Sequence, residues 1–357
     1  MNVFEALSLP ALLLIFTGAA TAVWFAGIRL VDATDVLSER FGLGEALGGL
    51  ILLAIVTNLP EVAITASASL GGNIGVAVGN ILGGIAIQTV MLAGLDAFGV
   101  QGSHPLTYRA ASLVLVLEGV LVIAVLTTAV AGSQLPGTLL FGHVEPGDLL
   151  IVVLWVAGIY LLAKARTGLP WQERDAAPGQ ELPRGHSKAQ KAREARNRRQ
   201  STVRQVAVFA VAAVVTLVGG VVLERSGSGI AEDVGMSGVL FGSTFLAAAT
   251  ALPEVSTGLA SVKLEDYQLA VSDIFGGNAF LPVLFFVATL LSGEAVLPHA
   301  QDTDIYLTGV GILLTAVYLW GLIFRPRRRF LRMGIDSLAV LVLYLLGLVG
   351  LVSVASG

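Results

Sequence analysis

Long apolar stretches, separated by short polar segments, run along almost the whole chain. Many of them reach the roughly 20 residues that an α-helix needs to cross a bilayer. They are continuous rather than alternating, unlike the strands of a membrane β-barrel. The pattern predicts an all-α polytopic membrane protein with ten transmembrane helices. The expected spans are 8–30, 44–70, 73–98, 108–131, 148–165, 203–223, 235–262, 267–292, 304–324 and 334–354.

One long polar segment, 166–202, divides the ten spans into two sets of five. We therefore expect a first half over 1–165, a connecting loop, and a second half over 203–357. With 55% hydrophobic and 13% charged residues, the chain is too apolar for a soluble domain of this length. The absence of cysteine excludes a disulfide framework and a thiolate metal site. The N-terminus lacks a basic region and a small-residue cleavage site, so no cleaved signal peptide is expected.

Lys and Arg are concentrated on one side of the expected spans. The segment Lys164–Arg204 carries 11 of the 21 basic residues and Arg325–Arg332 carries five more, whereas Arg225 is the exception on the opposite side. Because positive loops stay in the cytoplasm, we expect a cytoplasmic central loop, both termini outside, and insertion in the cytoplasmic (inner) membrane. The loop is expected to lie against anionic lipid headgroups, with a regulatory or partner-binding role as the alternative. Nucleic acid is not expected as a partner, because neither a suitable fold nor interleaved aromatic residues support it.

The two halves contain a related segment. When Thr57–Ile87 is placed over Thr250–Phe280, at an offset of 193 residues, 11 of the 31 positions are identical. Both segments begin with Thr-x-Leu-Pro-Glu and carry Gly-Gly 22 residues after the glutamate. The repeats, about 44–98 and 235–292, begin on opposite sides of the membrane, so the two five-helix halves are expected to be inverted. Inverted repeats with paired helix breaks are typical of secondary transporters, whose site lies near the midplane.

Each repeat places a proline and a carboxylate side by side inside an apolar span. Pro60 cannot donate a hydrogen bond to the carbonyl of Val56, and Pro253 breaks the second repeat in the same way. The breaks should free carbonyl oxygens around Thr57 and Thr250, which is costly in lipid unless a cation uses them. The glutamate after each proline would start the continuing half-helix and supply the charge.

The spans that follow supply polar partners at matched positions. Asn80 and Asp273 each lie 19 residues after the glutamate of their repeat. The glycines after them permit close helix approach. We expect a cluster of carboxylates and neutral oxygens, with no basic residue in any of the four spans. The candidate metal ligands are Glu61, Glu254, Asp273, Asn80, Thr57, Thr250 and Asn58.

Carboxylates and neutral oxygens, without His or Cys, suit a hard cation such as Ca²⁺ or Na⁺. Three negative charges can be balanced by three Na⁺, or by one Ca²⁺ and one proton, and an empty site would leave buried charge. This balance is consistent with obligatory exchange. The alternative is that each glutamate is protonated and only hydrogen-bonded within the bundle, which the symmetry-related pairing disfavours.

These paired segments resemble the α-repeats of the cation/calcium exchanger superfamily, which includes the sodium/calcium exchangers. Those repeats read Gly-Thr-Ser-Leu-Pro-Glu followed by Gly-Asn-x-x-Gly-Ser-Asn. The resemblance implies a central ion site built from the second, third, seventh and eighth spans, with Glu61 and Glu254 as the principal Ca²⁺ ligands. It places Asn80 and Asp273 beside them, together with backbone carbonyls of the two motif threonines. It also implies that the first and sixth spans glide past the core to alternate access.

The chain departs from this family pattern at several neutral oxygens. Asn58 and Ala251 stand where the family prefers serine, and Val76 and Leu269 stand where exchangers of this type often carry a hydroxyl. Neutral ligands are the ones most needed to hold several Na⁺ ions, whereas a carboxylate needs no further ligand to bind a proton. Proton coupling is therefore an alternative to Na⁺ coupling.

Three further polar residues lie in or beside the spans. Glu118 is in the middle of the fourth span and has no counterpart in the other half, so a structural role and a proton path are both open. Asp96 is expected to cap the end of the third span, and Gln88 to hydrogen-bond across helices.

The sequence predicts a secondary active cation antiporter that exchanges Ca²⁺ for Na⁺ by alternating access at a midplane carboxylate site. The alternatives are a cation/H⁺ exchanger (Ca²⁺/H⁺ or Na⁺/H⁺) and, from other classes, a cation channel or a transport-inactive structural protein. The lack of a wide polar pore lining disfavours the channel. Gly71–Gly75 is a turn between spans rather than a phosphate loop after a strand. We expect inorganic cations as partners, no nucleotide, no cofactor and no enzyme activity.

Overall fold

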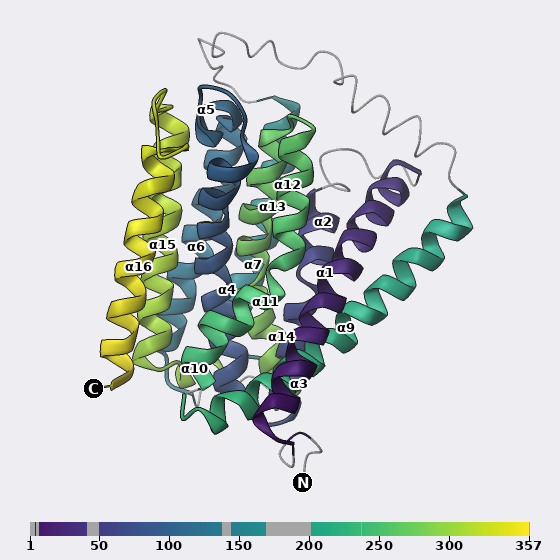
Figure 1. Ribbon diagram of the computed structural model, residues 1–357. Helices are drawn as coiled ribbons and strands as arrows, with labels where there is room; N and C mark the ends of the chain where they lie inside the picture. Colours follow the sequence, from purple (N-terminus) through teal and green to yellow (C-terminus); the bar gives the residue numbers. More distant parts are fainter. Residues whose placement is uncertain are drawn as a thin grey trace.

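The computed structural model describes residues 4, 7–40, 50–137, 144–168, 201–236 and 238–356. These residues are almost entirely helical, and the helices lie side by side in one elongated bundle (Figure 1). The α-helices are α1 (Leu9–Arg40), α2 (Leu50–Thr57), α3 (Leu59–Leu70), α4 (Ile74–Gly94), α5 (Leu106–Ala110), α6 (Leu113–Ser133), α7 (Pro146–Thr167), α9 (Thr202–Asp233), α10 (Gly238–Phe241), α11 (Ala247–Thr250), α12 (Leu252–Lys263), α13 (Tyr267–Phe280), α14 (Val283–Ser292), α15 (Asp302–Phe324) and α16 (Ile335–Ser356).

Short elements complete the architecture. A π-helical turn, Leu95–Gly99, extends α4, and a second one, Gly242–Leu246, links α10 to α11. A 3₁₀ turn, Leu297–His299, precedes α15. An antiparallel hairpin of β1 (Arg329–Phe330) and β2 (Met333–Gly334) joins α15 to α16. We call the end of the bundle with this hairpin the hairpin end, and the opposite one, where α1 begins and α16 finishes, the termini end (Figure 1).

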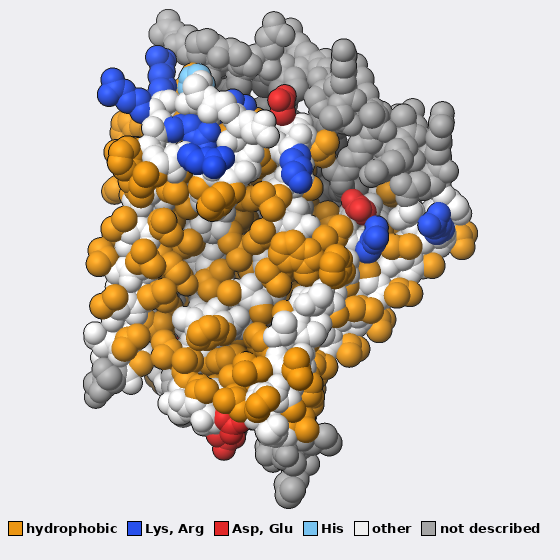
Figure 2. Space-filling view, viewed as in Figure 1, with side chains coloured by type: hydrophobic (Ala, Val, Ile, Leu, Met, Phe, Trp, Pro, Cys, Tyr) orange, Lys and Arg blue, Asp and Glu red, His pale blue; other side chains and the backbone are white. Residues whose placement is uncertain are grey.

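The expectation of an all-α polytopic membrane protein is confirmed. Among the described residues, eight helices are long and apolar enough to cross a membrane, and the pair Gly242–Thr250 and Leu252–Lys263, bent by 48°, is together long and apolar enough for a ninth. On the face seen in Figure 2, the surface between the two ends is mostly hydrophobic, and Lys and Arg side chains gather towards the hairpin end. The expected span 44–70 corresponds to α2 and α3, but its first residues lie outside the described part, so the count of ten stays a prediction. Most of the expected loop 166–202 also lies outside it.

Two helices are longer than the hydrophobic pattern indicates. We expected the sixth span to end at residue 223, yet α9 continues to Asp233. Likewise α1 continues to Arg40 rather than ending near residue 30. The two helices pack against each other along their length (Figure 1). This mutual packing keeps their polar ends helical, because tertiary contacts outweigh local propensity.

The repeat seen in the sequence is a repeat of structure. Helices α3 and α12 have the same length of 12 residues, and their bounds differ at both ends by the offset of 193. The starts of α4 and α13 differ by the same offset. From its break, α3 leads to the termini end and α12 to the hairpin end, so the two units are inverted (Figure 1).

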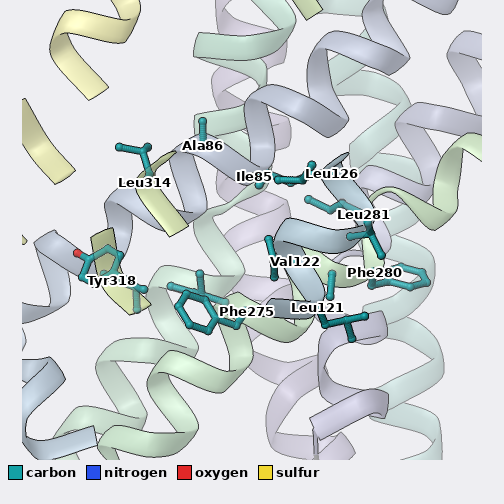
Figure 3. Close-up of a cluster of buried hydrophobic side chains, with 14 of the residues drawn as sticks. Ile85, Ala86, Leu121, Val122, Leu126, Phe275, Phe280, Leu281, Leu314 and Tyr318 are labelled. Carbon is teal, nitrogen blue, oxygen red and sulfur yellow. The ribbon is translucent and has the colours of Figure 1, made fainter. Parts of the chain in front are cut away.

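A large apolar core fills the space between α4, α6, α13 and α15. Its side chains interlock from all four helices, as Figure 3 shows for Ile85, Ala86, Leu121, Val122, Leu126, Phe275, Phe280, Leu281, Leu314 and Tyr318. Close packing of this kind holds α4 and α13 rigidly against each other. The two helices that were expected to carry Asn80 and Asp273 are thereby fixed next to the broken spans.

Candidate cation site

Both broken spans are interrupted at the residue before Leu-Pro-Glu. Asn58 separates α2 from α3 with φ −88° and ψ 16°, and Ala251 separates α11 from α12 with φ −79° and ψ 7°. In each case the proline lies in the first turn of the new helix, where its missing N–H is tolerated. The carbonyl groups before the break lose that donor, as the sequence predicts.

The two motif glutamates lie in the first turn of α3 and of α12. Glu61 and Glu254 are both fully buried, at 0% exposure. None of their four carboxylate oxygens has a hydrogen-bond partner within the described part of the chain. The positive ends of the two helix dipoles favour negative charge at these positions. A buried carboxylate without a partner is costly, so these oxygens are available to an ion.

The glutamate of each repeat faces the threonine of the other. Thr250 lies beside the carboxylate of Glu61, and Thr57 lies beside that of Glu254. The hydroxyl groups of the threonines donate instead to carbonyls of their own helices, at 3.1 Å to Leu53 O and 3.2 Å to Ala247 O. Their oxygen lone pairs are therefore left as acceptors, which suits a cation between the two repeats.

Asn80 and Asp273 join this group from α4 and α13. Asn80 is completely buried, and neither its amide nitrogen nor its amide oxygen has a partner among the described residues. Asp273 is 1% exposed. Glu254 lies close enough to Glu61 and to Asp273 for the negative charges to repel one another. The structure thus brings the predicted carboxylates into one buried region between the broken spans.

The approach of α4 to the second repeat depends on a glycine. A methyl group on Gly83 would overlap the Cα atom of Ser243, in the π-helical turn before α11. This supports the prediction that the glycines after Asn80 permit close helix contact. As the side chains are placed, no three carboxylate or His groups in the described residues have the spacing of a chelated metal. One ion would therefore meet at most two carboxylates here, supplemented by neutral oxygens.

Asn58 is placed differently from the other candidate ligands. Its Nδ2 donates to the carbonyl of Ala54 at 2.6 Å, and its Oδ1 accepts from Gln88 Nε2 at 3.3 Å. The hydrogen bond across helices that was predicted for Gln88 is confirmed. Gly277 faces this pair, and a methyl group there would lie 2.8 Å from Asn58 Nδ2. Any role of Asn58 as a ligand would compete with these bonds.

A third amide, after Asn58 and Gln88, extends the polar network on the same side. Asn278 donates to Thr89 Oγ1 at 2.9 Å. The positions that the repeat makes equivalent to Asn58 and Gln88 are Ala251 and Leu281, which are apolar. The surroundings of the first break, at Asn58, are therefore polar, whereas the equivalent positions at the second break, at Ala251, are apolar. The sequence predicts the bond of Gln88 across helices, but it does not predict Asn58 as the partner or the pair of Asn278 and Thr89. A position-by-position comparison of the repeats shows these polar residues without polar counterparts.

The other polar residues of the spans have structural partners. Glu118 accepts from Ser272 Oγ at 2.7 Å and from Arg166 Nη2 at 3.0 Å. These bonds support a structural role for Glu118 over a proton path, the two roles that the sequence leaves open. Asp96 accepts from the backbone of α5 and of β2, and so joins the end of the third span to the hairpin. Its role is wider than the helix cap that the sequence predicts.

Comparison with known proteins assigns the family. The sodium/calcium exchanger protein family model matches residues 11–164 and 204–352. The chain belongs to this family. The predicted superfamily is thereby confirmed, and the chain is a cation exchanger of the membrane rather than an enzyme.

Individual relatives agree with the assignment over nearly full length. The inner membrane protein YrbG of Escherichia coli (strain K12) is 28% identical over 340 residues, covering 87% of this chain and 95% of YrbG. The fold is shared with a sodium–calcium exchanger, NCX_Mj, at a TM-score of 0.59 and 17% identity, covering 96% of this chain and 99% of that one. It is also shared with an H⁺/Ca²⁺ exchanger, CAX, at a TM-score of 0.64 and 14% identity, covering 96% and 82%.

Proposed function

We propose that this protein is a secondary active antiporter that exchanges Ca²⁺ for Na⁺ by alternating access. The observation that carries the proposal is the pair Glu61 and Glu254. Two inverted, broken spans bring these carboxylates into the middle of the bundle, fully buried and without hydrogen-bond partners among the described residues. A lipid-embedded protein retains such groups where an ion balances them.

The neighbouring groups supply the remaining ligands for a hard cation. Ca²⁺ takes roughly six to eight oxygen ligands. Two carboxylates, the amide oxygen of Asn80, the oxygens of Thr57 and Thr250, and the carbonyls freed by the prolines make a set of this kind. Asp273 adds a further negative charge next to Glu254. We assign these groups as the transport site.

Proton coupling is the second candidate, favoured by one feature of the site. Val76 and Leu269 offer no oxygen one turn before Asn80 and Asp273. The set of neutral ligands is accordingly small for several Na⁺ ions, whereas two unpartnered carboxylates can each take a proton. The shared fold with an H⁺/Ca²⁺ exchanger is compatible with this coupling.

The distribution of charge supports an orientation. Lys and Arg gather towards the hairpin end (Figure 2), and α7, which precedes the central polar segment in the sequence, ends there (Figure 1). We assign the hairpin end to the cytoplasm, because basic loops stay there. Both termini would then face outward from the inner membrane. The halves 1–165 and 203–357 would be joined by a cytoplasmic loop, 166–202, that rests on anionic headgroups.

Transport by the purified chain in sealed vesicles tests the function. ⁴⁵Ca²⁺ uptake should be driven by an outward Na⁺ gradient, and should be much weaker with a pH gradient alone. Glu61→Gln and Glu254→Gln should each reduce uptake at least a hundredfold, because each removes one of two carboxylates. Glu265→Gln, an exposed glutamate in the turn after α12, is the matched control and should transport normally.

Each outcome separates the candidates. Uptake driven by the pH gradient and not by Na⁺ would assign the protein to H⁺ coupling. Ca²⁺ flux that needs no counter-ion would favour a channel. Folded, correctly inserted protein that takes up no Ca²⁺ under either gradient would exclude Ca²⁺ as the substrate.

A further inference from the structure

A cavity of about 460 Å³ opens at the termini end of the bundle. It lies between α9, the last turns of α3 and the start of α4, close to the labels of α3 and α10 in Figure 1. Its wall includes Ser67, Asn73, Val76, Glu224 and Ser228. The side chain of Glu224 is only 3% exposed, although the cavity reaches it. A carboxylate is thus placed deep in the wall of a space large enough for hydrated ions.

The surroundings of Glu224 are built from oxygen and nitrogen groups. Ser67 Oγ donates to Glu224 Oε2 at 3.0 Å. The side chains of Asn73 and Ser228 also face the carboxylate. The hydroxyl oxygen of Ser228 is shielded from solvent. A carboxylate with two hydroxyls and an amide is the donor set that hard cations prefer.

Two other charged groups line the same cavity. Arg225 Nε lies 3.9 Å from Glu224 Oε2, and its side chain is 37% exposed. Arg225 also lines a neighbouring groove of about 480 Å³ between α3 and α9, next to Ala63 and Val218. Glu232 is at the exposed rim. The cavity therefore carries two carboxylates and one guanidinium, and its excess charge is negative.

The cavity and the proposed transport site share helix α4. Val76, in the cavity wall, lies one helical turn before Asn80 on the same face of that helix. We propose that Ser67, Asn73, Glu224 and Ser228 form a second, low-affinity cation site, the Glu224 site, which binds the ion from the termini end before it reaches Glu61 and Glu254. This inference rests on the proposed function, because it names a binding step on the path to the transport site.

The Glu224 site has no exact counterpart in the other repeat. The repeat makes Val31 and Ala260 equivalent to Glu224 and Ser67, and Asp35 and Asp266 equivalent to Ser228 and Asn73. The counterpart positions therefore carry carboxylates where the Glu224 site has Ser228 and Asn73, and an apolar side chain where it has Glu224. The two entrances to the transport site thus differ in where their charged groups lie. Loss of the Glu224 site should weaken cation capture from the termini end and leave capture from the hairpin end unchanged.

Equilibrium binding of ⁴⁵Ca²⁺ separates this site from the transport site. The full chain with Glu61→Gln and Glu254→Gln should keep one weak binding site, with a dissociation constant of about 10⁻⁴ to 10⁻³ M. Adding Glu224→Gln should abolish the remaining binding. Asp233→Asn, which removes an exposed charge at the end of the same helix, is the matched control and should leave that binding intact.

Transport measured from each side gives the second readout. In vesicles of defined orientation, Glu224→Gln should raise the half-saturating Ca²⁺ concentration at the termini end about tenfold. The value at the hairpin end should change less than twofold. If Glu224→Gln fails to fold, Ser67→Ala serves as the second variant, because it removes one neutral ligand. It should raise the half-saturating Ca²⁺ concentration two- to threefold at the termini end only.

Three results would overturn the inference. The first is that the chain with Glu61→Gln and Glu254→Gln shows no residual Ca²⁺ binding. The second is that its residual binding survives the addition of Glu224→Gln. The third is that Glu224→Gln changes the half-saturating Ca²⁺ concentration equally at both ends. In each case the loss of transport in the single Glu61→Gln and Glu254→Gln variants would still support the proposed function, so the two proposals fail separately.

Discussion

Gly220 of α9 lies directly on Pro60, the proline of the first broken span. A methyl group at Gly220 would be 2.8 Å from Pro60 O and 3.0 Å from Ala63 Cβ. The same contact recurs in the other half, where a methyl group at Gly27 of α1 would be 2.8 Å from Pro253 Cβ. Positions 27 and 220 differ by the repeat offset of 193. Each long helix thus crosses the break of the opposite repeat at a glycine.

These paired contacts lie where the resemblance to exchangers implies a gliding movement. Helices α1 and α9 pack together, and α1 also packs on α12 as α9 does on α3. If the pair moves as a unit over the breaks, it moves over Pro60 and Pro253. Only a residue without a Cβ fits between the backbone of the long helix and the proline at these distances. We therefore interpret the two glycines as the positions that let the helix pair slide past the prolines without steric overlap.

Replacing either glycine by alanine should slow transport without removing ion binding. We expect Gly27→Ala and Gly220→Ala to lower the Ca²⁺ exchange rate at least fivefold, since overpacking a close contact costs about 1–3 kcal/mol. The Ca²⁺ affinity at equilibrium should change less than twofold. Exchange rates in vesicles and ⁴⁵Ca²⁺ binding in detergent measure the two effects.

The control for this pair is Gly18→Ala on α1, where a methyl group meets no atom within 4 Å. Alanine favours a helix over glycine by roughly 1 kcal/mol, so Gly18→Ala reports that effect alone and should exchange at the normal rate. Normal rates in Gly27→Ala and Gly220→Ala as well would show that these contacts do not limit the movement.

The ion pair of Glu118 and Arg166 should act on stability rather than on transport. Arg166→Leu leaves Glu118, a residue 4% exposed, with Ser272 as its remaining hydrogen-bond donor. We expect a loss of about 2–4 kcal/mol of unfolding free energy, because an uncompensated buried charge remains. Glu118→Gln should cost only about 1 kcal/mol, because Arg166, with a side chain 25% exposed, can turn to water.

Thermal unfolding in detergent ranks the two variants, and vesicle transport decides between the two roles of Glu118. A structural role predicts that folded Glu118→Gln protein transports Ca²⁺ at nearly the normal rate. Loss of transport in that variant, at unchanged unfolding temperature, would instead establish the proton path that the sequence left open.

Asp96 should tolerate neither alanine nor asparagine. Its carboxylate accepts from Leu106 N at 2.8 Å, Gly334 N at 2.7 Å and Ser337 Oγ at 2.9 Å. Asp96→Ala leaves these donors without an acceptor, and Asp96→Asn turns an NH₂ group towards at least one of them. Both should lose about 2–4 kcal/mol of unfolding free energy. Asp302→Asn, at an exposed aspartate, is the comparison; full stability of Asp96→Asn would contradict the hydrogen-bond geometry.

Much of the fold was predictable because the membrane imposes it. Continuous apolar stretches must become helices in lipid, so the spans and their approximate bounds followed from hydropathy. The helix breaks followed from Pro60 and Pro253, whose effect on the backbone is local. The repeat was visible because the two segments share rare features, proline beside glutamate, rather than common apolar residues.

The features that the sequence did not show depend on contacts between distant residues. Ser67 and Glu224 are 157 positions apart, and Asp96 and Gly334 are 238 apart. The expected span 203–223 stops just before Glu224, whereas packing keeps the chain helical to Asp233. No local pattern reports such pairings, which arise only when the helices are placed side by side.

Glu145 should make the stability of the protein depend on pH. It lies just before α7, is buried, and accepts from Leu297 N through Oε2 at 3.3 Å. Burial, and then the negative charge of Asp148, raises the pKa of Glu145 from 4.5 to about 7. The unfolded chain releases this proton near pH 4.5 and the folded chain only near pH 7. The stabilisation is therefore complete below about pH 4.5 and is lost as the pH rises to 7, a change of roughly 3 kcal/mol.

Glu145→Gln should remove this dependence, because the amide oxygen still accepts from Leu297 N and carries no charge. The unfolding temperature of the natural chain in detergent should fall between pH 5 and pH 7.5, and that of the variant should fall much less, so that the variant is the more stable of the two at pH 7.5. Glu294→Gln, an exposed glutamate before the 3₁₀ turn, should follow the natural chain. Parallel pH profiles for Glu145→Gln and the natural chain would show that another group controls the decline, because a titration that belongs to Glu145 cannot survive its replacement by an amide.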